Sequence, residues 1–191
     1  MTRRDTVASP YGDLMRPDRL PKPGCRVNLV CGPPASGKTT HVRLNAGKGD
    51  TRIDLDEIAR QRGYGRDRPP EAAALLLAER NERLARLSEY PADHVAWVIM
   101  GLPGHKLRDW WREQLNADVY LLMAPKKELL NRVRNDPERR PLIRMYARLI
   151  SQWFLREEAN RIGRILPGCD ESGWPTDRLH PWNSPAHGPA R

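Results

Sequence analysis

The chain has 191 residues, which is enough for about one domain with short tails. Charged residues make up 30% of it, and no apolar run approaches the roughly 20 residues that a membrane-spanning helix needs, so the composition favours a globular protein and excludes a membrane protein. The net charge of +9 comes mostly from arginine and favours polyanionic partners, although a coding bias toward arginine explains the excess equally well.

Composition divides the chain into three parts. Residues 1–24 are rich in proline and lack a helical or strand period, which predicts an extended N-terminal arm. Residues 25–166 alternate strand-like with helix-like runs and form the predicted domain. Residues 167–191 are rich in proline and glycine and predict a tail without long helices, in which Trp174 and Trp182 are available to dock on the domain or on a protein partner.

The cysteines and the first residues of the chain bear on its compartment. The three cysteines lack the CxxC spacing of zinc ribbons, and their odd number argues against a disulfide framework. No apolar stretch follows the N-terminal residues, as it would in a secretory signal. We therefore expect a cytoplasmic protein without membrane contacts.

A complete phosphate-binding motif, GPPASGKTT, follows the first predicted strand at residues 27–31. Its glycines let backbone N–H groups curl around an anion, its lysine reaches the β- and γ-phosphates of a nucleotide, and the threonine after the lysine ligates Mg²⁺. The residues expected to bind ATP are Gly32, Pro33, Pro34, Ala35, Ser36, Gly37, Lys38, Thr39 and Thr40. We expect Lys38 to act in catalysis as well, and Thr39 to be a metal ligand.

Carboxylates cluster at the end of the second predicted strand, residues 51–55. Phosphoryl transfer to a hydroxyl uses a carboxylate that accepts the hydroxyl proton, and carboxylates also help to hold Mg²⁺. We interpret Asp56 as the general base and Asp54 as a candidate metal ligand. An alternative is that Asp56 is the N-cap of a helix that begins at Glu57, and the two roles are compatible.

A short glycine-containing segment with four arginines follows these acids. The arginines are Arg60, Arg62, Arg66 and Arg68. The segment predicts a mobile basic loop at the place where a phosphate acceptor would approach. The alternative is a solvated loop without such a role.

The rest of the pattern predicts alternating helices and strands. Helices are expected over residues 71–87, 106–115, 126–134 and 142–162, and strands over 94–100 and 119–123. This order predicts an α/β fold, a three-layer sandwich with a mostly parallel central sheet, in which ligands bind at the carboxyl ends of the strands. The tryptophans at positions 97, 110, 111 and 153 are expected to pack in the core rather than to stack on bases.

These motifs resemble the kinase domain of bacteriophage-type 5′-polynucleotide kinases and, more widely, the P-loop kinases that include the zeta toxins. The matching segments are the phosphate-binding motif, the acidic motif at 53–58, and residues 95–100, 119–132 and 141–146. The resemblance covers most of residues 25–155. It implies ATP as the phosphate donor with Mg²⁺, places Asp56 at the general-base position, and implies a nucleic-acid 5′ end or a nucleotide as the acceptor, with single-stranded nucleic acid as a partner.

P-loop kinases have a small lid that closes on the triphosphate, and an arginine cluster around Pro137 matches its place. The cluster consists of Arg132, Arg134, Arg139, Arg140 and Arg144. Arg132 and Arg139 are the candidates for stabilising the transferring phosphate. Because Arg132 and Arg134 lie two positions apart, they cannot share one helical face, so one points to phosphate and the other to solvent. The alternative is a solvated basic helix end that the helix dipole favours.

Two departures from the family pattern leave alternatives open. The residues after the third strand, 101–104, include no acidic or polar side chain, and the fourth strand ends at Met123 without an aspartate. We expect an ATP-dependent kinase, with a zeta-toxin-like kinase of a small molecule as the alternative. A nucleotide hydrolase, or a nucleotide-binding module that regulates a phage or bacterial nucleic-acid complex, is the alternative without phosphoryl transfer to an acceptor.

Overall fold

A computed structural model describes residues 16–17 and 19–161 of the chain. Most of the expected N-terminal arm and the whole of the expected tail, residues 167–191, lie outside these residues. Within the described part of the arm, Leu20 is buried in the main core, and the Arg16 guanidinium lies 4.8 Å from the centre of the Trp110 ring. The end of the arm therefore packs on the domain.

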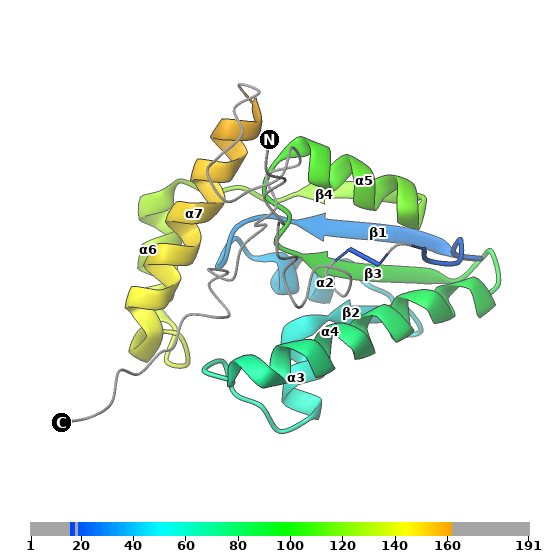
Figure 1. Ribbon diagram of the computed structural model, residues 1–191, viewed down its shortest axis with the longest axis horizontal. Helices are drawn as coiled ribbons and strands as arrows, with labels where there is room; N and C mark the ends of the chain where they lie inside the picture. Colours follow the sequence, from blue (N-terminus) through cyan, green and yellow to red (C-terminus); the bar gives the residue numbers. More distant parts are fainter. Residues whose placement is uncertain (1–15, 18, 162–191) are drawn as a thin grey trace, which may run out of the picture.

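Four parallel strands form the sheet in the described residues, in the order β2-β3-β1-β4 (Figure 1). They are β1 (Arg26–Cys31), β2 (Thr51–Asp54), β3 (Val95–Met100) and β4 (Ala117–Leu121). Leu29 at the centre of β1 pairs with Val98 on one side and with Val119 on the other. The predicted α/β fold with a parallel sheet is confirmed, and the carboxyl ends of all four strands lie at one edge.

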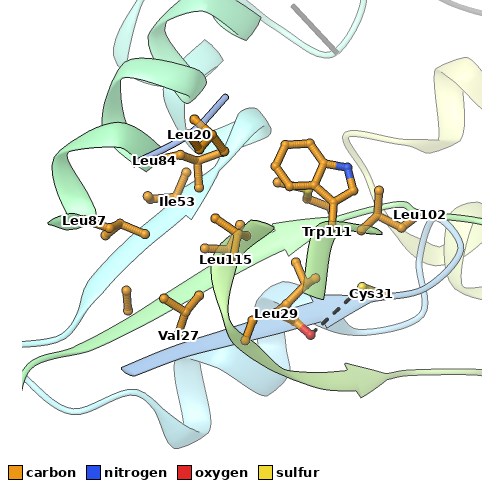
Figure 2. Packing of buried hydrophobic residues seen from close by; sticks show 14 of the residues in the cluster. Leu20, Val27, Leu29, Cys31, Ile53, Leu84, Leu87, Leu102, Trp111 and Leu115 are labelled. Carbon is orange, nitrogen blue, oxygen red and sulfur yellow. Dashed lines mark hydrogen bonds between the residues drawn. The ribbon is translucent and has the colours of Figure 1, made fainter. Parts of the chain in front are cut away.

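Three helices cover one face of the sheet: α3 (Leu55–Gln61), α4 (Pro70–Ala85) and α5 (His105–Leu115). Because side chains alternate along a strand, Val27 and Leu29 point to this face, where they join the main core with Trp111 and Leu115 of α5 (Figure 2). All four side chains are at most 1% exposed. A 3₁₀ turn, Arg86–Glu89, continues α4 and buries Leu87 in the same core.

The opposite face carries α2 (Lys38–Asn45), which follows the phosphate-binding motif. Val30 of β1 and Val42 of α2 form a second, smaller core with Trp97 of β3. The fold is therefore a three-layer sandwich. Trp97, Trp111 and Trp153 are 7%, 1% and 4% exposed, as expected of tryptophans that pack in cores.

The last two helices, α6 (Lys126–Asn135) and α7 (Ile143–Arg161), lie side by side at the end of the sheet where the strands terminate (Figure 1). A 3₁₀ turn, Arg140–Leu142, joins them. Leu129 and Ile150 belong to the small core between them, against which Ala35 of the phosphate-binding motif packs. The pair thus covers the motif.

Hydrogen bonds fix α7 to the segment that follows β3. Trp153 Nε1 donates to the carbonyl oxygen of Gly101 at 2.6 Å. Glu157 accepts from the Gly104 N–H at 2.7 Å and pairs with both terminal nitrogens of Arg108 in α5 at 2.7 and 2.8 Å. Because bidentate arginine–carboxylate pairs are geometrically specific, these contacts set the place of α7 relative to the sheet.

Each of the four strands differs from the sequence prediction at one or both ends: β1 begins one residue early at Arg26, β3 begins one residue late at Val95, and β4 ends two residues early at Leu121. The second strand ends at Asp54, one residue early, because the Asp54 side chain accepts a hydrogen bond from the Asp56 N–H at 3.0 Å and caps α3. The prediction of Asp56 as N-cap was therefore wrong. The fourth strand begins at Ala117, two residues early, because Asn116 adopts a left-handed conformation that ends α5 (φ 45°, ψ 48°).

No helix among the described residues is long and apolar enough to cross a membrane.

Candidate active site

The phosphate-binding motif forms a curled loop between β1 and α2. Gly32, Ala35 and Gly37 have φ values of 144°, 63° and 97°. Left-handed residues within a tight loop turn backbone N–H groups toward its inside, and the first N–H groups of α2 lack acceptors within the helix. The loop therefore presents several backbone donors to an anion.

Gly32 is required by close packing as well as by its backbone angle. A Cβ atom at this position would collide with the carbonyl oxygen of Leu122 and would lie 2.8 Å from Ser36 Oγ. Ser36 Oγ is itself buried and has no hydrogen-bond partner in the described residues. The loop thus holds a hydroxyl that a bound phosphate would satisfy.

Lys38, the first residue of α2, turns back over the loop. Its Nζ donates to the carbonyl oxygens of Gly32 at 2.8 Å and Pro33 at 2.7 Å. Burial lowers the pKa of Lys38 to about 8, and the carboxylates of Asp54 and Asp56 only partly oppose this effect. Lys38 therefore loses its proton more readily than an ordinary lysine, and its ammonium group points at the loop.

The lowered pKa predicts that nucleotide binding depends on pH. Bound phosphates favour the charged form of Lys38, so ATP affinity should be constant below its pKa of about 8 and fall by up to about tenfold per pH unit above it. Calorimetric titrations in buffers of different ionisation enthalpy should detect proton uptake on binding near pH 8. Lys38→Arg should remove this dependence, because arginine stays charged. An affinity that is unchanged from pH 7 to pH 9.5 in the unmodified protein would contradict this assignment.

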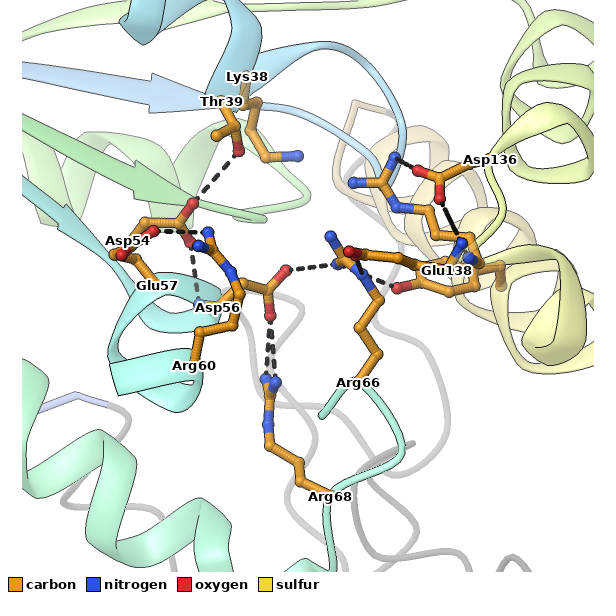
Figure 3. Close-up of polar contacts among 12 residues, drawn as sticks. Lys38, Thr39, Asp54, Asp56, Glu57, Arg60, Arg66, Arg68, Asp136 and Glu138 are labelled. Atoms are coloured by element: carbon orange, nitrogen blue, oxygen red, sulfur yellow. Dashed lines mark hydrogen bonds and ion pairs between the residues drawn. The ribbon is translucent and has the colours of Figure 1, made fainter. Parts of the chain in front are cut away.

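Thr39 and Asp54 meet across the site, from the first turn of α2 and the end of β2. Thr39 Oγ1 donates to Asp54 Oδ2 at 3.2 Å (Figure 3). Burial and the neighbouring Asp56 raise the pKa of Asp54 above its ordinary value. A hydroxyl and a carboxylate are hard oxygen ligands that fit Mg²⁺, which keeps several waters and takes few protein ligands. The described residues hold no group of three or more histidine, cysteine, aspartate or glutamate side chains suited to a metal.

Asp56 lies in the first turn of α3, where two arginines hold its carboxylate (Figure 3). Arg66 Nη1 is 3.1 Å from Asp56 Oδ2, and Arg68 Nη1 and Nη2 are each 3.2 Å from Asp56 Oδ1. The Arg68 side chain is only 3% exposed, and that of Arg66 is 22% exposed. The loop between α3 and α4 therefore directs these two side chains at Asp56.

Arg66 also joins this loop to the helices that cover the site. Its Nε pairs with Glu138 Oε2 at 3.1 Å, and its Nη1 lies 3.4 Å from the hydroxyl of Tyr146 in α7. Burial lowers the pKa of Arg66, but Tyr146 and Asp56 together outweigh it and raise the pKa above its ordinary value, so Arg66 remains charged. One guanidinium thus contacts α3, the segment between α6 and α7, and α7 itself.

The predicted lid arginines divide into Arg132 and Arg139, which line the site, and three others, which do not. Arg132 donates to the carbonyl oxygen of Ala35 at 3.2 Å, whereas Arg134 bonds Asn131 of its own helix at 2.9 Å, as their spacing predicts. Arg139 pairs with Asp136 at 3.0 Å and lies 5.9 Å from the centre of the Tyr146 ring. The exposed side chains of this cluster that do not line the site are Arg134, Arg140 and Arg144.

A cavity of about 880 Å³ joins these groups. Four buried polar side-chain atoms in the described residues have no hydrogen-bond partner, and all four belong to residues that line this cavity. They are Ser36 Oγ, His41 Nε2, Arg139 Nε and Gln152 Oε1. Buried polar groups are normally paired, so this concentration indicates a site built for polar ligands.

Sequence reasoning missed part of this arrangement. The mobile basic loop predicted for Arg60, Arg62, Arg66 and Arg68 is wrong for Arg60, which belongs to α3, and Arg66 and Arg68 both pair with Asp56. Sequence reasoning gave no role to Gln152, for which the sequence offers no signal beyond its place on α7. Tyr146 did carry a signal, because it belongs to the segment 141–146 that matches the P-loop kinases.

Comparison with solved structures finds a likeness to the shikimate kinase of Acinetobacter baumannii, determined in complex with shikimate. The sequence identity is 22% and the TM-score 0.46, over 72% of this chain and 79% of that chain. No protein-family model and no curated protein matches the sequence. At this identity and score, the likeness says nothing about substrate or activity.

Proposed function

We propose that the protein is an ATP-dependent phosphotransferase that moves the γ-phosphate of ATP to a hydroxyl group. The observation that carries this proposal is that one cavity is lined by both the phosphate-binding loop with Lys38 and the carboxylate of Asp56. A nucleotide-binding loop alone would serve hydrolysis or regulation equally well. A carboxylate facing the same cavity adds a proton acceptor for an attacking hydroxyl.

In this proposal the acceptor oxygen attacks the γ-phosphorus. A bond forms between them, and the bond from the γ-phosphorus to the bridging oxygen of ADP breaks, leaving its electron pair on ADP. The proton of the attacking hydroxyl passes to Asp56. Lys38 and the backbone donors of the loop hold the phosphates, and Arg139, whose Nε has no hydrogen-bond partner among the described residues, donates to the charge that develops on the transferring group.

Mg²⁺ is expected at Thr39 and Asp54, whose oxygens lie 3.2 Å apart. When bound it would neutralise charge on the phosphates. Arg132 contacts the loop carbonyl of Ala35, from where it would brace the nucleotide. These roles agree with those that the resemblance to P-loop kinases implies.

A second candidate is a nucleotide-binding module without phosphoryl transfer. It is favoured by the ion pairs that Asp56 makes with Arg66 and Arg68, since a carboxylate engaged by two cations is a poor proton acceptor until one of them is drawn away. The lack of a carboxylate after β4 favours it as well, because P-loop enzymes commonly use such an acid to hold Mg²⁺.

Incubation of the protein with γ-labelled ATP and Mg²⁺ would separate the two candidates. The acceptor panel should contain 5′-hydroxyl oligonucleotides, nucleosides, nucleotides and small hydroxy acids. Phosphotransferase activity predicts label on one class of acceptor. Release of inorganic phosphate at one rate with every acceptor would instead indicate a hydrolase, and bound ATP without turnover would indicate a regulatory module.

The salt dependence of acceptor binding separates a polynucleotide from a small molecule. A single strand that contacts several phosphates should lose about 0.7 log units of affinity per log unit of salt for each contact. A small acceptor contacts one or two cations and should show a shallow slope. The resemblance to polynucleotide kinases implies the steep slope, and the alternative small-molecule kinase implies the shallow one.

A further inference from the structure

Strand β4 forms an outer edge of the sheet. Among the described residues it pairs with β1 on one side and with no strand on the other (Figure 1). An unpaired edge presents a row of backbone N–H and C=O groups to which a further strand can bind. The edge of β4 is therefore a candidate docking surface.

The backbone of β4 shows which of its groups point outward. The N–H of Leu122, the residue after β4, donates to the carbonyl oxygen of Cys31 in β1 at 2.9 Å. Neighbouring residues of a strand direct their N–H and C=O groups to opposite sides, so Ala117, Val119 and Leu121 direct theirs away from β1. These three residues carry the hydrogen-bonding groups of the free edge.

Apolar side chains at this edge are exposed. Tyr120, Leu121 and Met123 are 39%, 41% and 47% exposed. Edge strands are commonly protected from pairing by lysine, proline or several charges, whereas the one charged residue in the sequence of β4 is Asp118. The edge therefore has the features of a strand that another strand covers, with one carboxylate to be matched.

The described chain ends on the same side of the sheet. Near the end of α7, Glu157 bonds the Gly104 N–H after β3 and Arg108 of α5, so this end of the helix lies at the carboxyl ends of the strands. Helix α5 packs against β4 as well as against α7. Helix α7 ends toward β4 and away from β2 (Figure 1). The residues after Arg161 therefore begin near the carboxyl end of β4 and meet it in the antiparallel direction.

The next residues of the chain have the composition of a short strand. Residues 162–166 read Ile-Gly-Arg-Ile-Leu, and Pro167 and Gly168 follow them. A short apolar run that contains β-branched residues and ends at proline and glycine is typical of a strand. The one charged residue of this run is Arg164, whose charge is complementary to that of Asp118 in β4.

We infer that residues 162–166 pair antiparallel with the outer edge of β4, with Arg164 opposite Asp118. Opposite charges that face each other across two strands attract, and this pair uses the one charge that each strand carries. In the same register Ile162 lies opposite Tyr120 and covers part of its exposed side chain. The segment supplies a further strand and closes the edge.

The register also satisfies the free backbone groups of β4. It places Gly163 opposite Val119 and Ile165 opposite Ala117. Residues that face each other in this way across an antiparallel pair exchange both of their hydrogen bonds. Proline at position 165 would therefore remove a donor that the pairing requires.

Amide hydrogen exchange in the full chain, followed by NMR, tests the backbone pairing. We expect the amides of Ala117 and Val119 to be protected, and Ile165→Pro to speed their exchange by at least about tenfold, because proline cannot donate to the ladder. Ser184→Pro, in the same tail, is the control and should change neither rate. The amide of Leu29, at the centre of β1, reports whether the fold persists. Unprotected exchange of both edge amides in the unmodified protein would overturn the inference.

Charge reversal tests the register without removing a backbone N–H. Asp118→Arg and Arg164→Asp each place like charges opposite one another and should speed exchange at Val119 by about two- to fivefold. The double variant restores opposite charges and should bring the rate back to within about twofold of that of the unmodified protein. Effects of the two single changes that add in the double variant would contradict the pairing.

Dilution separates this segment from a second copy of the chain, which presents the same free edge. Pairing with residues 162–166 is intramolecular, so the exchange rate at Val119 should stay constant over an about hundredfold dilution. Protection that falls on dilution and survives Ile165→Pro would assign the edge to a second copy, and the inference would be wrong.

Discussion

Asp56→Asn is expected to lower phosphoryl transfer by about 10²–10⁴-fold, the usual contribution of a general base. Asparagine has nearly the same shape as aspartate but cannot accept the hydroxyl proton. The change leaves the N-terminus of α3 capped, because the cap is the side chain of Asp54, which accepts from the backbone N–H of residue 56. Nucleotide affinity, measured by calorimetry beside single-turnover transfer rates, should change little.

The control for this variant is Glu57→Gln, which removes the adjacent carboxylate. Glu57 pairs with Arg60 on its own helix, does not line the cavity, and should be dispensable for turnover. Thermal unfolding of both variants reports whether loss of the ion pairs of Asp56 loosens the loop between α3 and α4. Turnover of Asp56→Asn equal to that of the unmodified protein would remove Asp56 from the mechanism and favour the regulatory module.

Lys38→Ala is expected to weaken ATP binding by about 10- to 150-fold, the effect of losing a charge-assisted hydrogen bond worth about 1.5–3 kcal/mol. Turnover should fall further, since Lys38 would also stabilise charge that develops in the transition state. The fold should persist, because Nζ contacts only the carbonyl oxygens of Gly32 and Pro33 in the described residues. Equilibrium titration with Mg²⁺ and ATP measures the first effect, and initial rates measure the second.

Lys48→Ala is the matched control, since Lys48 is exposed in the turn after α2 and does not line the cavity. It lowers the net charge by the same amount and should leave affinity unchanged. Undiminished ATP binding by Lys38→Ala would show that the loop does not hold the nucleotide.

The central sheet could be predicted because its strands carry their own signal. Strand β1 is buried on both faces through Val27, Leu29 and the apolar residues beside them. Short apolar runs of this kind, when predicted helices separate them along the chain, indicate the strands of a parallel sheet. The predicted ends of the strands and helices were less accurate than their positions. The end of β2, for example, depends on a single hydrogen bond from the Asp56 N–H to the Asp54 side chain, and the hydrophobic period of the sequence contains no signal for it.

The part of the candidate site that could be predicted is the part formed by residues close together in the sequence. The spacing of Gly32, Gly37 and Lys38 allows a curled backbone and places the lysine at the start of a helix, and the structure has that geometry. The nucleotide, metal and catalytic roles of the loop, Thr39 and Asp54 stay predictions, as does the lid role of the arginine cluster.

The sequence by itself determined the α/β architecture and the conformation of the phosphate-binding loop, because both depend on residue types within a few positions of one another. Only the tertiary structure decided which cations meet Asp56 and which helices line the cavity beside it. Arg66 and Arg68 are 10 and 12 residues from Asp56, and Tyr146 is 80 residues from Arg66. A run of arginines has the same charge whether it faces solvent or a cavity, and here the direction of Arg66 and Arg68 follows from their contacts with Asp56 and, for Arg66, with Tyr146 of α7.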